Sequence, residues 1–170
     1  MLDTLITSKT RLRLLIKFFI SQANHGYLNG LASEMGESTN SIRKELNRLF
    51  DAGYIVKIKN NNKVEYKANI NHPMFEILQK VVRKHLGIEQ IIETVLDRMG
   101  KIEQIILVGD YANGVDSGKI EIFLVGENLD MDYISNIEVK VEKLISRKIS
   151  FYLTNKFIGE GPNIIIYNNE

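Results

Sequence analysis

The sequence contains no cysteine. Disulfides and thiolate metal sites are therefore excluded, and a cysteine-free chain suits a reducing compartment, so we expect a cytoplasmic protein. Apolar runs all fall short of the roughly 20 residues that span a bilayer. The first residues, Met1 to Thr4, also lack the basic and apolar regions of a secretory signal. The sequence thus predicts no membrane partner.

Recognisable catalytic and phosphate-binding motifs are missing as well. The sequence has no Ser/His/Asp spacing and no P-loop, and Gly159 to Pro162 is turn sequence that no helical pattern follows. Its three histidines, His25, His72 and His85, are scattered, with no acidic cluster at ligand spacing. We predict no metal site and no cofactor.

Charge is unevenly distributed along the chain. Residues 1–70 hold 11 lysines and arginines against 6 acidic residues, whereas residues 71–170 hold 11 against 15. A net charge of +5 suits a polyanionic partner, and −4 argues against a nucleic-acid groove along the whole molecule. The asymmetry also predicts two domains with separate roles.

Two helices are predicted in the first 36 residues. One is capped by Thr7 or Ser8, runs to about Ser21 and ends before a turn at residues 24–26. The second spans about Leu28 to Met35, and Gly36 supplies the tight turn after it.

A third helix is predicted from the capping residues Ser38 and Thr39 to about Ala52. Its apolar stripe is Ile42, Leu46, Leu49 and Phe50. Polar side chains cover the opposite face, and Arg and Asn can pair bidentately with guanine and adenine in the major groove. The predicted base-reading residues are Thr39, Asn40, Arg43, Lys44 and Asn47.

A basic hairpin is predicted to follow, with strands at residues 55–59 and 63–68 around an Asn60-Asn61-Asn62 tip. Its lysines Lys57, Lys59 and Lys63 are candidate contacts to DNA phosphates. Lysines along a strand also protect an exposed sheet edge from aggregation. Directly after a helix-turn-helix, a DNA-contacting wing is the favoured interpretation.

Residues 8–70 resemble the winged-helix repressors of the ArsR and MarR kind. The resemblance is carried by the runs 38–46 and 49–55 and by the lysine hairpin. It implies a DNA-binding domain over residues 1–70 and paired half-sites contacted by a homodimer. Metal sensing through Cys or His clusters is not expected, because this chain has none.

Residues 71–87 are predicted to form a connector helix from Met74 to Leu86, and a further helix spans Ile88 to Met99. These helices would carry either a dimer contact or packing against the second domain.

The second half predicts a small mixed sheet with helices on one face. Strands are expected at residues 105–108, 120–125, 149–153 and 164–167, and a helix at about 134–145. The predicted fold class is therefore α+β: a winged helix-turn-helix, a helical connector and a mixed-sheet domain over residues 88–170.

This order of elements resembles the minimal nucleotidyltransferase domain of the polymerase-β-like superfamily. In that family a Gly-Ser turn precedes an Asp-x-Asp pair and a third acid, which hold magnesium for phosphoryl transfer. Here Asp110 follows Gly109 in the serine place, Lys119 and Glu121 occupy the acid pair, and Ser150 stands near the third acid. We therefore expect no catalytic residues.

The residues of that degenerate motif remain candidates for a small-molecule site. Gly109, Asp110, Lys119 and Glu121 would line a pocket for a nucleotide or another effector, or else form a solvated edge. Asp116 would offer a further carboxylate from the loop.

Three functions follow from these patterns. The favoured one is a dimeric transcriptional regulator that binds double-stranded DNA and carries an inactive sensor or oligomerisation domain. The alternatives are a nucleotidyltransferase targeted by its winged helix and a winged helix that binds only protein. A magnesium-dependent label transfer from a nucleoside triphosphate, lost in Glu121→Ala, would favour the enzyme.

Overall fold

The computed structural model describes residues 2–170, which form two compact units, Met1–His85 and Leu86–Glu170. Among the described residues, none of the helices combines the length and the apolar content needed to cross a membrane.

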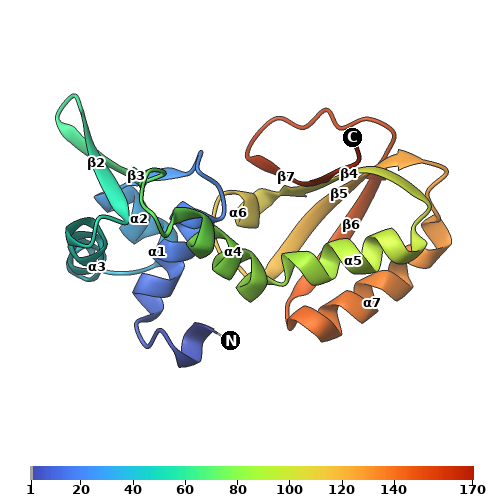
Figure 1. Cartoon of the computed structure of the whole chain (residues 1–170), viewed down its shortest axis with the longest axis horizontal. Coiled ribbons are helices and arrows are strands. Elements are labelled where there is room, and N and C mark those ends of the chain that lie inside the picture. Colours follow the sequence, from blue (N-terminus) through green and yellow to red (C-terminus); the bar gives the residue numbers. More distant parts are fainter. Residues whose placement is uncertain (1) are drawn as a thin grey trace. The chain divides into compact units, whose positions relative to one another are not determined.

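The first unit combines helices with a three-stranded antiparallel sheet of order β1-β3-β2 (Figure 1). This arrangement is winged-helix-like, as predicted. Its elements are η1 (Leu2–Thr4), α1 (Lys9–Phe19), β1 (His25–Tyr27), α2 (Leu28–Met35), α3 (Thr39–Asp51), β2 (Ile55–Asn60), β3 (Lys63–Ala68) and α4 (Phe75–Leu86).

Helix α1 is the centre of this unit. Its N-cap Ser8 accepts a hydrogen bond from the Arg11 backbone N–H, as expected for a capping serine. Every residue from Leu14 to Ile20 is buried, so the C-terminal half of the helix is enclosed on all sides. Phe19 also contacts Phe75 of α4, with ring centroids 5.8 Å apart.

Strand β1 corrects the predicted turn at residues 24–26. His25 pairs with Lys67 and Tyr27 with Glu65, so the segment adds a third strand to the hairpin. Gly26 lies so close to Leu31 that a side chain there would overlap it. A three-residue strand is too short to show a period of two.

The turn between α2 and α3 forms as predicted. Gly36 adopts φ of 62°, and its N–H bonds to the carbonyls of Ala32 and Ser33. Ser38 then caps α3 by accepting from the Ser41 N–H at 3.1 Å. The turn thus leaves three residues, 36–38, between the end of α2 and the start of α3.

The hairpin is also confirmed. Strands β2 and β3 pair from Ile55↔Ala68 to Asn60↔Lys63, which leaves a two-residue turn. Asn61 takes the left-handed conformation there, with φ of 54°.

The second unit holds a mixed sheet of order β6-β5-β4-β7, in which β5 and β6 are parallel and the other neighbours antiparallel. Helices α5 and α7 lie side by side on one face (Figure 1). Its elements are α5 (Ile88–Arg98), β4 (Lys101–Val108), α6 (Gly109–Ala112), β5 (Lys119–Glu127), η2 (Met131–Tyr133), α7 (Ile134–Ile145), β6 (Lys148–Thr154) and β7 (Asn163–Asn168).

The outer edge of β6 is closed by two carboxylates of α7. Glu142 accepts from the backbone N–H of Ile149 at 3.1 Å, and Glu138 accepts from that of Phe151 at 3.0 Å. The hydrogen bond from Ile149 and the ion pair with Lys148 lower the pKa of Glu142. Because these N–H groups already have acceptors, the edge offers a poor template for pairing with another strand.

Helix α4 belongs largely to the first unit, which extends through His85. Phe75 and Val82 are buried, whereas Ile77 is 50% exposed and Met74, just before the helix, is 38% exposed. One face of α4 therefore packs on the rest of the first unit, and apolar side chains remain exposed on and just before the helix.

Candidate nucleic-acid interface

Helix α3 presents a continuous polar face to solvent. Ile42, Leu46 and Leu49 are buried and attach the helix to the core. All five predicted base-reading side chains are exposed, and four of them are spaced i, i+3, i+4 and i+7 along one face. These residues are Thr39, Asn40, Arg43, Lys44 and Asn47.

Arg43 is partly oriented before any ligand binds. Its Nη1 donates to Oδ1 of Asn40, one turn earlier, at 3.1 Å. This bond restricts a long side chain and leaves other guanidinium donors available, because arginine carries five N–H groups. The helix therefore offers a fork suited to bidentate hydrogen bonding.

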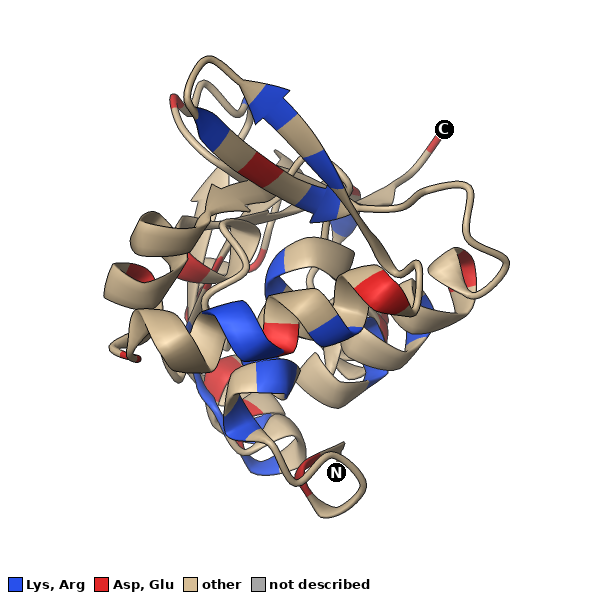
Figure 2. Cartoon of the chain, turned by 90° about the vertical axis from the view of Figure 1, so that its left-hand side faces the viewer, with Lys and Arg blue, Asp and Glu red and all other residues tan. Residues whose placement is uncertain are grey.

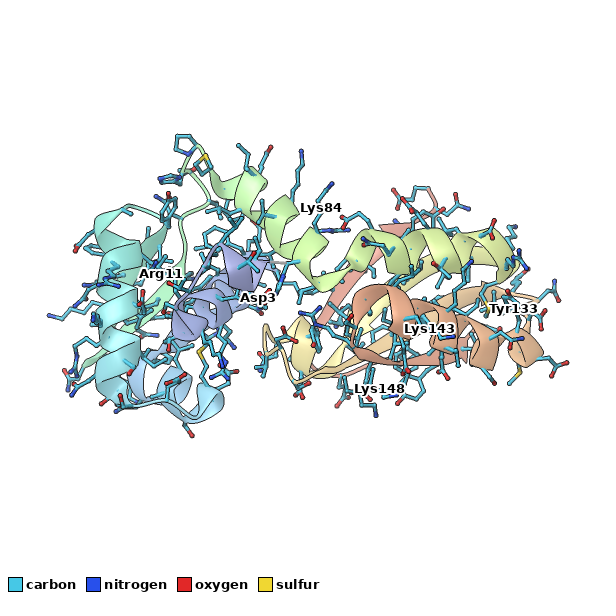
Figure 3. All side chains as sticks on the ribbon, turned by 90° about the horizontal axis from the view of Figure 1, so that it is seen from below. Asp3, Arg11, Lys84, Tyr133, Lys143 and Lys148 are labelled. Carbon is cyan, nitrogen blue, oxygen red and sulfur yellow. The ribbon has the colours of Figure 1, made fainter. Side chains whose placement is uncertain are left out.

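A buried carboxylate connects α3 to α1. Glu45 is only 6% exposed although it carries a charge. Its oxygens accept from Arg11 Nε at 2.8 Å and from Ser8 Oγ at 3.0 Å, and Arg48 Nη1 lies 3.3 Å away. Arg11 lies between the two helices (Figure 3). Glu45 thus fixes α3 against the N-terminal turn of α1.

The charge state of Glu45 follows from these partners. Burial alone would raise the pKa of its carboxyl group, but the hydrogen bonds from Arg11 and Ser8 and the nearby positive charges outweigh burial and lower it. The group is therefore ionised at neutral pH. The apolar stripe predicted for α3 did not include this residue.

Helix α1 is also joined to α2 and to the turn. Lys17, buried at 4% exposure, donates to Glu34 at 2.9 Å. Arg13 donates to the Met35 carbonyl at 3.0 Å and to Glu37 at 3.1 Å. The two helices of the helix-turn-helix are thus bonded to the same third helix.

Phe50 is a correction to the predicted core. It is 40% exposed, and the Lys57 ammonium lies 4.1 Å from the centroid of its ring. Lys57 is also 6.0 Å from the Tyr66 ring. The end of α3 lies beyond the hydrophobic core, so Phe50 connects the helix to the hairpin through a cation–π contact.

The register places the three hairpin lysines on two different faces. Lys57 and Lys59 alternate with Ile58 and share the face of the buried Ile55. Lys63 pairs with Asn60 on the other face, and its ammonium lies 5.8 Å from the centroid of the Tyr27 ring. Figure 2 shows the basic positions on the hairpin and on α3. By register, Lys57 and Lys59 share one face of the hairpin and Lys63 lies on the other.

In the second unit, three of the four predicted pocket residues come together. A Cβ on Gly109 would lie 2.7 Å from Glu121 Oε2, and Lys119 Nζ is 3.9 Å from Glu121 Oε1. Tyr152 also donates to Glu121 at 3.0 Å, which raises the pKa of the tyrosine. Asp110 is exposed on the short helix α6.

The acidic positions of this site do not form a metal-binding group. Glu121 pairs in register with Ser150, so a hydroxyl faces the carboxylate. Across residues 2–170, there is no cluster of three or more His, Asp or Glu side chains that could hold a metal ion.

Asp116 has a structural partner that the sequence did not reveal. It bonds to Arg147 at 2.9 Å and accepts a hydrogen bond from the buried Tyr111 hydroxyl. Burial, followed by the hydrogen bond to Asp116, raises the pKa of Tyr111 well above its usual range. This network ties the loop before β5 to the segment between α7 and β6, and Tyr111 packs in the core.

Comparison with known proteins adds one structural likeness. The crystal structure of the AntR antimony-specific transcriptional repressor aligns with 54% of this chain and 77% of its own, at 20% identity and a TM-score of 0.41. Neither a protein-family model nor a curated protein matches the sequence. The geometry of this chain therefore carries what is proposed about its function.

We predict that Glu45→Ala lowers the free energy of unfolding by about 1–3 kcal/mol, because it removes a buried acceptor from several donors. Urea denaturation measures this loss. Since the folded-state pKa of Glu45 is lowered, its stabilisation is present above its usual value of 4.5 and is lost as the pH falls below it. The difference in unfolding free energy between wild type and variant should therefore shrink as the pH falls below 4.5.

Glu37→Ala is the matched control, because it removes a partly exposed ion pair with Arg13. Its cost should be about 0.2–1 kcal/mol. Equal losses in the two variants, or a difference that does not depend on pH, would contradict the role assigned to Glu45.

Proposed function

We propose that this protein is a sequence-specific DNA-binding transcriptional regulator. The observation that carries the proposal is the exposed polar face of α3, which lies on a helix held in place by the buried Glu45. Arg and Asn side chains on such a face can pair with base edges in the major groove. Asn40, Arg43, Lys44 and Asn47 would make these contacts.

The hairpin would supply contacts to the phosphate backbone. Lys59 is exposed on the same face as Lys57, which the cation–π contact directs toward α3. The excess of positive charge in residues 1–70 supports a polyanionic partner. It weighs against the alternative of a winged helix that binds only protein.

The second unit would act as a sensor or oligomerisation module without transferase activity. Lys119 lies beside Glu121, and Ser150 stands opposite it, where two-metal chemistry requires carboxylates. Lysine and serine are poor ligands for magnesium, which disfavours the nucleotidyltransferase alternative.

We predict that Arg43→Ala weakens binding to the specific site by about 1–3 kcal/mol and leaves binding to random DNA nearly unchanged. Lys59→Ala should weaken both equally and reduce the salt slope by about one. Lys63→Ala is the matched control, because it removes the same charge from the other face of the hairpin and should have the smaller effect. Fluorescence anisotropy at several salt concentrations measures all three.

Two results would contradict these roles. Equal losses on specific and random DNA for Arg43→Ala would remove base recognition from α3. A Lys63→Ala effect as large as that of Lys59→Ala would show that the wing does not approach DNA by its α3-facing side.

The regulator would work as a homodimer, because paired half-sites match a two-fold axis in the protein. Ile70, Met74 and Ile77 are exposed at 56%, 38% and 50% at and before the start of α4. This helix has Glu76 in its first turn and Arg83 and Lys84 in its last. Antiparallel packing of two copies would place acidic starts near basic ends.

We predict that Ile77→Glu converts the dimer to monomer in sedimentation experiments, because it places a charge in an apolar contact. Leu144→Glu, a similar change at a 55% exposed position of α7, should leave the dimer intact. A dimer that survives Ile77→Glu, or a wild-type protein that is monomeric at high concentration, would refute this interface.

A further inference from the structure

A cavity lies in the C-terminal unit, away from the cluster of Gly109 and Glu121. It has a volume of about 560 Å³, within the range of small-molecule sites. Gln104, Val125 and Asn168 form its floor, and they are direct cross-strand partners on the sheet face that α5 and α7 leave uncovered. Lys101 and Asn169 also line it.

The backbone is irregular where the floor is built. The β4–β5 pairing shifts between Ile102 and Gln104, and the β4–β7 pairing shifts between Ile105 and Ile106. Bulges of this kind redirect side chains and are frequent beside functional sites. Here they flank Gln104, whose Nε2 donates to Asn168 Oδ1 at 3.2 Å.

The loop after β6 supplies a preformed wall. Thr154 Oγ1 accepts from the Lys156 N–H at 3.2 Å and donates to its carbonyl at 2.8 Å, which fixes the start of the loop. Phe157 then packs on Phe123 with ring centroids 5.1 Å apart. Gly159 follows so closely that a Cβ there would overlap the Phe157 ring. Phe123 and the close approach of Gly159 therefore position the Phe157 ring.

The lining chemistry selects one class of ligand. Lys101 and Lys156 form no ion pair with any residue in the range 2–170, and Glu103 is the acidic group at the site, so the cavity favours an anion. Carboxamides of Gln104, Asn155, Asn168 and Asn169 offer both donors and acceptors, which suits vicinal hydroxyl groups. The negative face of Phe157 suits the C–H face of a sugar ring.

We propose that this cavity binds a small polyhydroxylated anion, a sugar phosphate or a sugar acid. Lys101 and Lys156 would hold the anionic group, the carboxamides would hydrogen-bond the hydroxyls, and Phe157 would cover one face of the ring. The site is separate from the residues that resemble a nucleotidyltransferase centre. Only its use as an effector site rests on the proposed regulatory function.

The proposal is tested by titrating the full-length protein with glucose 6-phosphate and with glucuronate. Calorimetry measures the affinity, and NMR spectra monitor the side-chain amide signals. At least one of the two should bind saturably and about tenfold more tightly than neutral glucose or inorganic phosphate. The Gln104 and Asn168 amide signals should shift. Because no DNA is present, the outcome is independent of whether α3 binds DNA.

Lys156→Ala and Gln104→Ala should each weaken binding about tenfold, which corresponds to about 1.4 kcal/mol. Lys140→Ala is the matched control, since it removes an exposed charge from α7 outside the cavity. Three results would overturn the proposal: no binding of either charged sugar at 10 mM, equal binding of inorganic phosphate, or unchanged affinity in both cavity variants. Selective binding of one charged sugar would distinguish phosphate from carboxylate recognition.

Discussion

The buried carboxylate of Glu45 is the interaction on which the proposed DNA-binding surface depends. A charged group at 6% exposure is costly to bury unless donors compensate for the lost water. Ser8 and Arg11 provide those donors from α1, and Arg48 adds a charge from the next turn of α3. Because these bonds have defined directions, they restrict the rotation of α3 about its axis more than apolar packing alone would. That rotation determines which side chains face outward.

Further contacts in the first unit hold α2 and the hairpin in place. The Lys17–Glu34 pair holds α2 to α1, and Phe50 and Lys57 connect the end of α3 to the hairpin. Helix α3 and the hairpin are thereby held in one framework, which would lower the ordering cost of the proposed binding to DNA. The second unit uses its polar side chains differently. There Asp116 and Arg147 tie down a loop, and the α7 carboxylates close one sheet edge. The cavity lined by Gln104 and Phe157 lies on the sheet face opposite α5 and α7.

Local signals predicted much of the fold. The bounds of α2, the capping by Ser38 and the hairpin turn depend on short-range rules, and the strands of the second unit were marked by apolar runs. Interactions between distant residues were not predictable in this way. Glu45 looks like a surface residue in sequence, and Asp116 and Arg147 are 31 positions apart. The separation of Lys63 from Lys59 depends on strand register, which residue type alone does not determine. The nucleotidyltransferase resemblance, the homodimer and the site roles remain predictions.

The central claim is that the exposed face of α3 recognises specific DNA sequences. It is tested most directly by selecting genomic fragments from the source organism on the purified protein at near-physiological salt. The comparison is an Arg43→Ala, Lys44→Ala double variant, whose changes lie on the exposed face of α3. If α3 reads bases, the wild type enriches a few palindromic sites and the variant loses them, although circular dichroism shows that the fold of the variant is unchanged. Enrichment of the same sites by both proteins would contradict recognition through α3, and flat recovery by the wild type, with and without the charged sugars, would contradict a sequence-specific regulator.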